Sequence, residues 1–264
     1  MHSPFQADKR FANNYPISAD KPKTAQAFAS LIEGMDQSLG EVMDHLEKLG
    51  VSENTLIIFL GDNGSDAPLG SIDGHFSSAP LRGKKVGIYE GGVRIPFIAA
   101  WAKNNPESSS QRKHPIAKGE ILQERSSIMD IFPTVLELAD IKNPKDNKID
   151  GSDLWKIFDG RKDNKHKTNI LMHFPHAHRG NYFTTYIDGD WKVIYHYNPE
   201  HPTQPKYELY NLTNDPYENK DLSKENSKVL AKMVKKMASQ LEKEDAVYPI
   251  DANSKTLKPI IPSK

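Results

Sequence analysis

The sequence predicts an α/β portion followed by a small antiparallel sheet with one helix. Three observations lead to this prediction. An amphipathic helix runs into an unbroken apolar stretch, a second apolar stretch follows a long Gly- and Ser-rich loop, and short strands joined by tight turns come later. We place the α/β portion over residues 1–165 and the antiparallel portion over residues 166–264, because 264 residues can bury two modest cores.

The first portion begins with a helix. From about Thr24 apolar residues recur at helical spacing, and Gly50 lies where a glycine commonly ends a helix. Residues 55–60 form an unbroken apolar run, which is typical of a strand buried on both faces in a parallel sheet. Residues 94–101 predict a second buried strand, and residues 130–139 predict a further helix.

The second portion follows a polar connection. Residues 142–168 are rich in Lys, Asp, Asn and Gly, so we expect them to run over the surface near a domain boundary. Asp188-Gly189 is a hairpin turn signal. The expected strands are 169–174, 182–187, 191–197 and 207–211, and the expected helix is 227–243. The last twenty or so residues are expected to wrap the surface of this portion.

Composition excludes several classes of function. There are 35 basic and 35 acidic residues, so no bulk charge attracts nucleic acid or an anionic membrane. The chain has no cysteine, which excludes disulfides and thiolate metal sites. Its first residues lack the pattern of a signal peptide, and no stretch approaches the roughly 20 apolar residues of a membrane helix. We therefore expect no nucleic-acid partner and no membrane span, and the compartment is left open.

The first candidate site follows the first apolar strand directly. Asp62 and Asn63 stand between two glycines there, at the strand end where open α/β sheets bind ligands. Their oxygens suit a hard cation such as Ca²⁺ or Mg²⁺, and glycines let the backbone turn sharply beside an ion. Taken alone, the same residues are more typical of an ordinary turn.

Two further groups of residues could carry chemistry. The loop Pro80-Leu81-Arg82-Gly83-Lys84-Lys85 brings three cations together with a glycine, which suits an oxyanion, although a solvated basic loop has the same composition. Histidines also cluster near the middle of the chain, at His173, His176 and His178. They could bind a metal or line a substrate rim, but no cysteine or acidic residue accompanies them, so a zinc site is the weaker interpretation.

These motifs occur in a fixed order, and together they resemble the sulfatase family of the alkaline-phosphatase-like superfamily. The resemblance covers nearly the whole chain. Its motifs are His2-Ser3-Pro4, the Asp62-Asn63-Gly64 turn, PLRG-x-K followed by YEGGVR-x-P over 80–96, Asp130 with Pro133-Thr134, IDGS over 149–152, FPH over 174–176, GDWK over 189–192 and ELYNL-x-NDP over 208–216. The resemblance implies a mixed or parallel catalytic sheet and hydrolysis of sulfate esters of aryl alcohols or sugars.

The resemblance also implies roles for individual residues. Asp62 and Asn63 match the family's ligands to a divalent metal, most often Ca²⁺. Lys85 matches the lysine that contacts sulfate, with Lys84 as the neighbour that could be confused with it. His2 matches the histidine thought to protonate the leaving alcohol, and His176 resembles a residue at the substrate rim. Arg82, Glu90 and Arg94 are expected to hold the loop rather than touch substrate.

The family's nucleophile is a formylglycine made from Cys or Ser in a C/S-x-P-x-R motif, and its precursor is not found in this chain. Residues 78–82 read Ser-Ala-Pro-Leu-Arg, but they come after the Asp62 turn and lack the Thr-Gly that follows in the family, so we reject this match. The acidic pair that precedes the turn in the family is missing too. The sequence is therefore expected to be the carboxy-terminal part of a sulfatase, inactive alone, unless a partner chain supplies the rest.

Two alternatives remain open at this point. One is a phosphoester or phosphonate hydrolase of the same superfamily, and the other is a non-catalytic homologue that binds sulfated glycans. Expected partners are a sulfated small molecule or a sulfated glycan. Because a sheet without its first strands exposes an unpaired edge, we also expect self-association. Family members are often periplasmic or extracellular, but the sequence does not assign a compartment.

Overall fold

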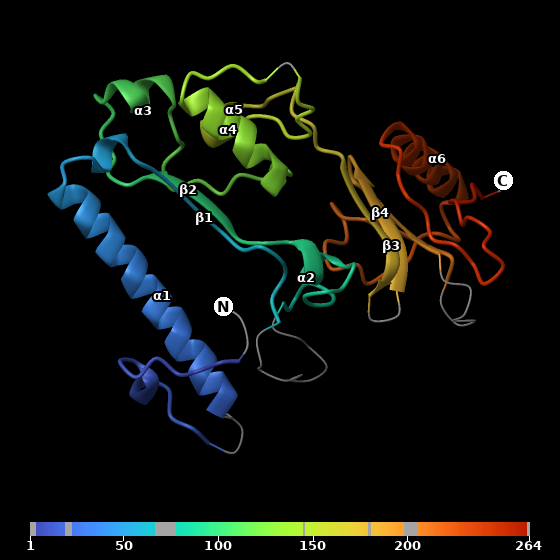
Figure 1. The fold of residues 1–264 in the computed structure, drawn as a ribbon, viewed down its shortest axis with the longest axis horizontal. Coiled ribbons are helices and arrows are strands. Elements are labelled where there is room, and N and C mark those ends of the chain that lie inside the picture. Colours follow the sequence, from blue (N-terminus) through green and yellow to red (C-terminus); the bar gives the residue numbers. More distant parts are fainter. Residues whose placement is uncertain are drawn as a thin grey trace. The chain divides into compact units, whose positions relative to one another are not determined.

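The computed structural model describes residues 4–18, 23–66, 78–144, 146–178, 181–197 and 205–262. The chain divides into two compact units, which are described separately (Figure 1). Unit 1 consists of Met1–Gly87, Gly91–Glu124 and Ile128–His166. Unit 2 consists of Ile88–Glu90, Arg125–Ser127 and Lys167–Lys264. Short 3₁₀ helices span Ala12–Asn14, Ser52–Asn54 and Ile128–Asp130.

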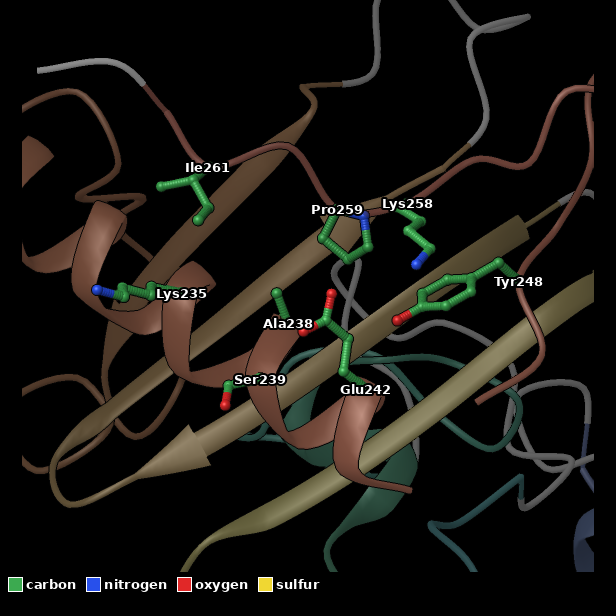
Figure 2. Close-up of a pocket in the computed structure, with 8 residues that line it drawn as sticks. All are labelled: Lys235, Ala238, Ser239, Glu242, Tyr248, Lys258, Pro259 and Ile261. Carbon is green, nitrogen blue, oxygen red and sulfur yellow. The ribbon is translucent and has the colours of Figure 1, made fainter. Parts of the chain in front are cut away.

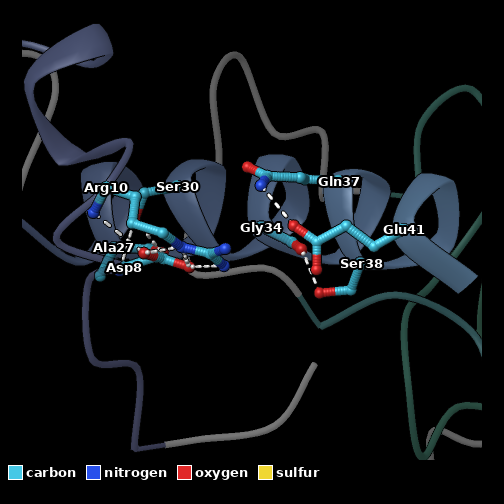
Figure 3. A network of polar contacts seen from close by, with 8 residues as sticks. All are labelled: Asp8, Arg10, Ala27, Ser30, Gly34, Gln37, Ser38 and Glu41. Atoms are coloured by element: carbon cyan, nitrogen blue, oxygen red, sulfur yellow. Dashed lines mark hydrogen bonds and ion pairs between the residues drawn. The ribbon is translucent and has the colours of Figure 1, made fainter.

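Unit 1 opens with the predicted amphipathic helix, α1 (Lys23–Lys48). Gly50 has φ +71°, and two hydrogen bonds close the helix end: Gly50 N to Glu47 O at 2.9 Å and Val51 N to Leu46 O at 3.1 Å. These bonds form a Schellman motif, which confirms the predicted stop. Figure 3 shows the preceding segment against this helix, where the amide of Asp8 donates to Ser30 Oγ at 3.1 Å.

The two predicted strands are present as β1 (Leu56–Leu60) and β2 (Phe97–Trp101). They pair antiparallel, with Leu56 opposite Trp101, so the expectation of parallel neighbours was wrong and this part of the sheet fits the mixed alternative. The expectation of burial on both faces was also wrong. Alternate residues of β2 face a core that includes Trp101, while Ile98 is 59% exposed, because no further element of the described chain covers that face.

The core of unit 1 exposes another error in the sequence analysis. The stretch 142–168 was expected to be surface connection, yet it contains the helix α5 (Trp155–Phe158), and Trp155, Ile157 and Phe158 are buried. These residues pack with Trp101. They escaped notice because a single apolar turn is hidden by the Lys- and Asp-rich residues around it. Two other short helices, α3 (Ser109–Lys113) and α4 (Ile131–Leu138), complete the unit.

Unit 2 contains the predicted antiparallel sheet in the order β3-β4-β5-β6. The strands are β3 (Ile170–His178), β4 (Asn181–Asp188), β5 (Trp191–His196) and β6 (Tyr207–Asn211). The helix α6 (Ser227–Lys243) covers one face of this sheet, where Val193, Tyr195 and Leu209 pack against it (Figure 1). Gly189, with φ +57°, turns the chain between β4 and β5 as the hairpin signal predicts.

Residues of β5 and β6 alternate between the two faces of this sheet. Val193, Tyr195 and Leu209 face α6, while Ile194 and Tyr210 belong to a second apolar cluster on the opposite face. That second cluster includes Ile88, which comes from a distant part of the sequence. The sheet therefore packs a helix on one side and a loop segment on the other. No helix in the described part of the chain is long and apolar enough to cross a membrane.

Candidate functional site

The candidate metal-binding turn follows β1 without a break. Gly61 N donates to the carbonyl of Pro96 at 3.2 Å, which keeps the strand pairing up to the turn. Asp62 is exposed and Asn63 is half-buried. One carboxylate and one amide oxygen fit a hard cation, but they make at most a partial ligand set. Among the residues that the structure describes, no three acidic or histidine side chains gather into a metal site.

The segment of residues 80–92, called the lysine loop, lies directly against this turn. Gly64 N donates to the carbonyl of Gly92 at 2.9 Å, and Lys85 N donates to the carbonyl of Ser65 at 3.0 Å. A Cβ built on Gly64 would overlap the carbonyl oxygen of Gly91, so a glycine is required at this position. The structure thus brings Asp62 and Asn63 into the same local assembly as the backbone of Lys85.

The lysine loop is also closed on itself. Gly87 N donates to Lys84 O at 2.8 Å, and Gly91 N donates to Arg82 O at 2.8 Å. Ser78 Oγ donates to Gly91 O at 2.8 Å, so this hydroxyl, which belongs to the rejected S-x-P-x-R match, supports the loop backbone. The last residues of the loop belong to the helix α2 (Glu90–Val93). These bonds fix the course of the backbone on both sides of the two lysines.

The two lysines of the loop have different surroundings. The ammonium of Lys84 forms an ion pair with Asp66 at 2.8 Å. Within the described ranges, the structure gives the half-buried Lys85 side chain no ion pair or hydrogen bond. The loop therefore holds one lysine in an internal pair and leaves the other available for a ligand.

Not all of the predicted histidines lie within the described residues. His2 lies outside the described residues. His176 lies on β3 in unit 2, where it is exposed and its ring contacts Phe174 at 4.2 Å between centroids. His173 has a structural position, with Nδ1 2.7 Å from Thr184 Oγ1 and Nε2 2.7 Å from the carbonyl of Val247. Burial lowers the pKa of this imidazole. The side chain of His178 is outside the described residues.

Unit 2 contains a group of buried charges, of which the sequence analysis named only Glu90, as a residue that holds the loop. Lys192 is fully buried, and its ammonium lies 2.7 Å from Glu218 and 3.0 Å from Glu90. Glu208 forms a second centre, with His196 Nε2 at 2.7 Å from its carboxylate. Burial tends to raise the pKa of Glu208, but hydrogen bonds from His196, Tyr210 and Tyr89 together bring it below its ordinary value. All but His196 and Glu218 lie in segments that carried the family resemblance, which was the available signal.

A pocket of about 350 Å³ is found elsewhere in unit 2 (Figure 2). It lies between α6 and the carboxy-terminal segment and includes Lys235, Glu242, Tyr248 and Lys258. Two ammonium groups and a carboxylate give it mixed charge, and Lys258 Nζ lies 5.3 Å from the centre of the Tyr248 ring. None of the predicted site residues lines it, so it is not the candidate catalytic site.

Sequence comparisons identify relatives of this chain. A family model described as "Sulfatase" matches residues 1–141, and one described as "N-sulphoglucosamine sulphohydrolase, C-terminal" matches residues 84–246. The chain is 32% identical to human steryl-sulfatase over 154 residues, which are 57% of this chain and 24% of that protein. It is 28% identical to a sulfatase of Formosa agariphila over 239 residues, 79% of this chain and 37% of that one. The chain thus spans well under half of these relatives.

Solved structures show the same likeness and confirm the α/β class. The protein Ps i-CgsB matches with TM-score 0.70 and 26% identity, over 90% of this chain and 47% of its own. A protein solved with its substrate D-glucosamine-2-N,6-O-disulfate matches with TM-score 0.64 and 22% identity, over 84% of this chain and 41% of its own. A phosphonate monoester hydrolase of Agrobacterium radiobacter is less similar, with TM-score 0.58 and 20% identity, over 83% and 41%.

Proposed function

The chain belongs to the sulfatase family, and we propose that it forms the carboxy-terminal part of an enzyme that hydrolyses sulfate esters. The observation that best supports this proposal is the contact between Gly64 and Gly92, which joins a turn with cation-binding oxygens to a loop with an available lysine. A sulfate ester needs both features, because its oxygens carry negative charge that must be neutralised as the ester bond breaks.

We assign the following roles within this proposal. Asp62 and Asn63 would be two of the ligands to a divalent metal, which we propose is Ca²⁺ and which would polarise the sulfate and neutralise its charge. The Lys85 ammonium would bind a sulfate oxygen, while Lys84 would stay paired with Asp66. His2 would donate a proton to the leaving alcohol oxygen, and His176 would contact the alcohol part of the substrate at its rim.

The proposal also covers the organisation of the chain. Residues 1–165 would be the carboxy-terminal portion of the catalytic α/β domain, and residues 166–264 a small subdomain with an extended tail. The formylglycine expected in the family would come from sequence that this chain does not contain, and it would supply the nucleophile. Taken alone, the chain is therefore expected to bind anions but not to turn over a sulfate ester.

The substrate class is proposed to be a sulfated sugar or an aryl sulfate. Support comes from the solved relative bound to a disulfated glucosamine, although the similarity at 22% identity concerns the fold alone. A phosphoester or a phosphonate ester is the alternative, and the likeness to the Agrobacterium phosphonate hydrolase, at 20% identity, likewise concerns the fold alone. Sulfate and phosphate monoesters differ in charge at neutral pH, so a site with one available lysine and a partial metal site favours the monoanionic sulfate.

The two neighbouring lysines provide a matched test of this proposal. Binding of radiolabelled inorganic sulfate to the chain with Ca²⁺ present would be measured for the wild type, Lys85→Met and Lys84→Met. We expect Lys85→Met to weaken binding about tenfold or more, as loss of a charge-assisted contact does, and Lys84→Met to weaken it much less. Equal effects of the two substitutions would contradict the assignment of Lys85.

The activity itself is tested on the full-length product of the source gene. Parallel assays with an aryl sulfate and an aryl phosphate should show hydrolysis of the sulfate at the higher rate. A higher rate with the phosphate would support the phosphoester alternative. Sulfate binding without hydrolysis of either ester by the full-length product would support a non-catalytic glycan-binding protein.

A further inference from the structure

We infer that the three-residue segment Ile88–Glu90, called the anchor segment, positions the lysine loop, and that Lys192 and Glu208 are the positioning residues that hold it. The anchor segment belongs to unit 2, although its neighbours in the sequence on both sides belong to unit 1. The functional part of this inference rests on the proposed function, because the loop is taken to bind the anion. The structural part, which is that the anchor segment fixes the backbone near residues 87–91, can be tested separately.

Glu90 is held by a buried ion triad. Its carboxylate lies 3.0 Å from the ammonium of Lys192, and Lys192 in turn lies 2.7 Å from Glu218. Glu218 also accepts a hydrogen bond from the backbone amide of Glu90 at 2.6 Å. The side chain and the main chain of Glu90 are thereby fixed to the same two partners. The two buried carboxylates require the ammonium between them, because a buried carboxylate without a cationic partner has lost its hydration and gained nothing in return.

Tyr89 is held by a second polar centre. Its hydroxyl donates to the carboxylate of Glu208 at 3.0–3.1 Å, and the hydroxyl of Tyr210 donates to the same carboxylate. His196 Nε2 lies 2.7 Å from Glu208 as well. The rings of Tyr89 and Tyr210 meet edge to face with centroids 6.3 Å apart. Three donors on one carboxylate define the position of the phenol more narrowly than a single hydrogen bond could.

Ile88 completes the anchor segment through apolar contact. It is 4% exposed and packs in the cluster that contains Ile187, Ile194 and Tyr210. All three consecutive side chains of the anchor segment therefore bind the sheet face opposite α6, each by a different interaction. Three successive attachments leave the backbone little freedom to shift or rotate, so the ends of the segment are fixed.

Chain continuity connects this attachment to the candidate site. Gly87 and Gly91 flank the anchor segment, and their amides donate to Lys84 O and Arg82 O, which close the lysine loop. Gly92, one residue further on, accepts the hydrogen bond from Gly64. Whatever fixes residues 88–90 therefore sets where these bonds can form. Buried charge networks add little net stability, and in some proteins they specify a single conformation, which suits a positioning role for this one.

Substitutions that change a single polar group test the inference, and Tyr89→Phe, which removes one hydroxyl, disturbs the fold least. Amide hydrogen exchange would be measured on the full chain for Tyr89→Phe, for Glu208→Gln and for the matched control Tyr207→Phe. Tyr207 also lies on the sheet and its hydroxyl donates to the carbonyl of Ile260, but it packs against the cluster on the α6 face. We expect residues 81–92 to exchange about tenfold faster in both variants. Exchange of α6 should be unchanged in Tyr89→Phe, whereas it should also rise in Glu208→Gln, because that substitution lowers the stability of the whole unit. The control should leave residues 81–92 at the wild-type rate.

Affinity for inorganic sulfate gives the second readout. Tyr89→Phe should weaken sulfate binding several-fold although Tyr89 contacts no ligand, and Tyr207→Phe should not. Unchanged exchange of residues 81–92 in Tyr89→Phe, or equal acceleration in the control, would overturn the inference. If the wild type fails to bind sulfate while the loop loosens as expected, the proposed function fails and the anchor stands.

Discussion

The backbone amide of Gly64 donates to the carbonyl of Gly92 at 2.9 Å, and this bond joins two motifs that lie about thirty residues apart. Such a close approach of two chain segments is possible because Gly64 has no side chain. A Cβ on Gly92 would lie 2.6 Å from Lys84 O, and one on Gly64 would overlap Gly91. The need for glycine at Gly64 follows from this contact, whereas the need at Gly92 follows from the carbonyls of Gly87 and Lys84 within the loop itself; neither follows from an unusual φ angle.

Substitution of Gly64 by Ala should therefore separate the turn from the loop. We expect the variant to lose most of its sulfate affinity and to lower the free energy of unfolding of unit 1 by about 1–3 kcal/mol, as steric overpacking does. Gly40→Ala is the matched control. Gly40 lies within α1 with nothing near its Cβ position, so the same chemical change should stabilise the helix by up to about 1 kcal/mol. Two changes of opposite sign in urea unfolding would support the assignment.

Cation binding by the chain alone should be weak. Asp62 and Asn63 offer two side-chain oxygens, whereas Ca²⁺ takes six to eight, so we expect a dissociation constant of about 1 mM or weaker. Asp62→Asn should abolish the calorimetric signal, and Asp44→Asn on the exposed surface of α1 should not. Tight Ca²⁺ binding by the isolated chain would show that it supplies a complete ligand set, contrary to the proposal.

The buried carboxylate of Glu208 predicts a pH dependence of stability. Its pKa in the folded protein lies below the ordinary value of 4.5, so its ionised form adds stability that is present above pH 4.5 and lost as the pH falls through the folded-state pKa. Glu208→Gln should therefore be less stable than the wild type by about 2 kcal/mol at pH 7. The difference should shrink as the pH falls below 4.5, through the folded-state pKa.

Urea unfolding at several pH values would measure this effect. Glu225→Gln is the control, because Glu225 forms an exposed pair with Lys220 at 2.8 Å and such pairs contribute little. The control should track the wild type over the whole range. A Glu208→Gln deficit that stays undiminished down to the lowest pH at which the wild type is still folded would show that the loss comes from packing rather than from the charge.

Local sequence patterns predicted most of the elements in this chain. The helix α6 has the predicted bounds, and the four strands of unit 2 are found within a few residues, because period and turn chemistry are local properties. The antiparallel pairing of β1 with β2 was not predicted, since an apolar run does not specify the direction of its neighbour. Trp155 and Phe158 were missed because their short helix is embedded in a charged stretch.

The candidate site could be predicted from the sequence in part, because some of its residues stand in local motifs. The order of the Asp62 turn and the lysine loop indicated a shared site, and the resemblance to the sulfatase family indicated Lys85; both stay predictions. The difference between Lys84 and Lys85 required the pair with Asp66, which a linear pattern does not contain. The attachment of Tyr89 to Glu208 spans 119 residues of sequence, and contacts at that separation are defined only by the folded chain.

The unpaired strand edges of unit 1 and the exposed face of β2 beside them predict self-association of the isolated chain. In the described part of unit 1 the sheet has two strands, so each keeps one unpaired edge, and Ile98 is 59% exposed beside it. Sedimentation velocity should show concentration-dependent association, and Ile98→Lys should reduce it without unfolding the chain, because a lysine at an edge disfavours strand pairing. Ile260→Lys is the matched control, since Ile260 is 57% exposed in the carboxy-terminal segment of unit 2. If both lysines reduce association equally, general surface hydrophobicity rather than the sheet edge is responsible.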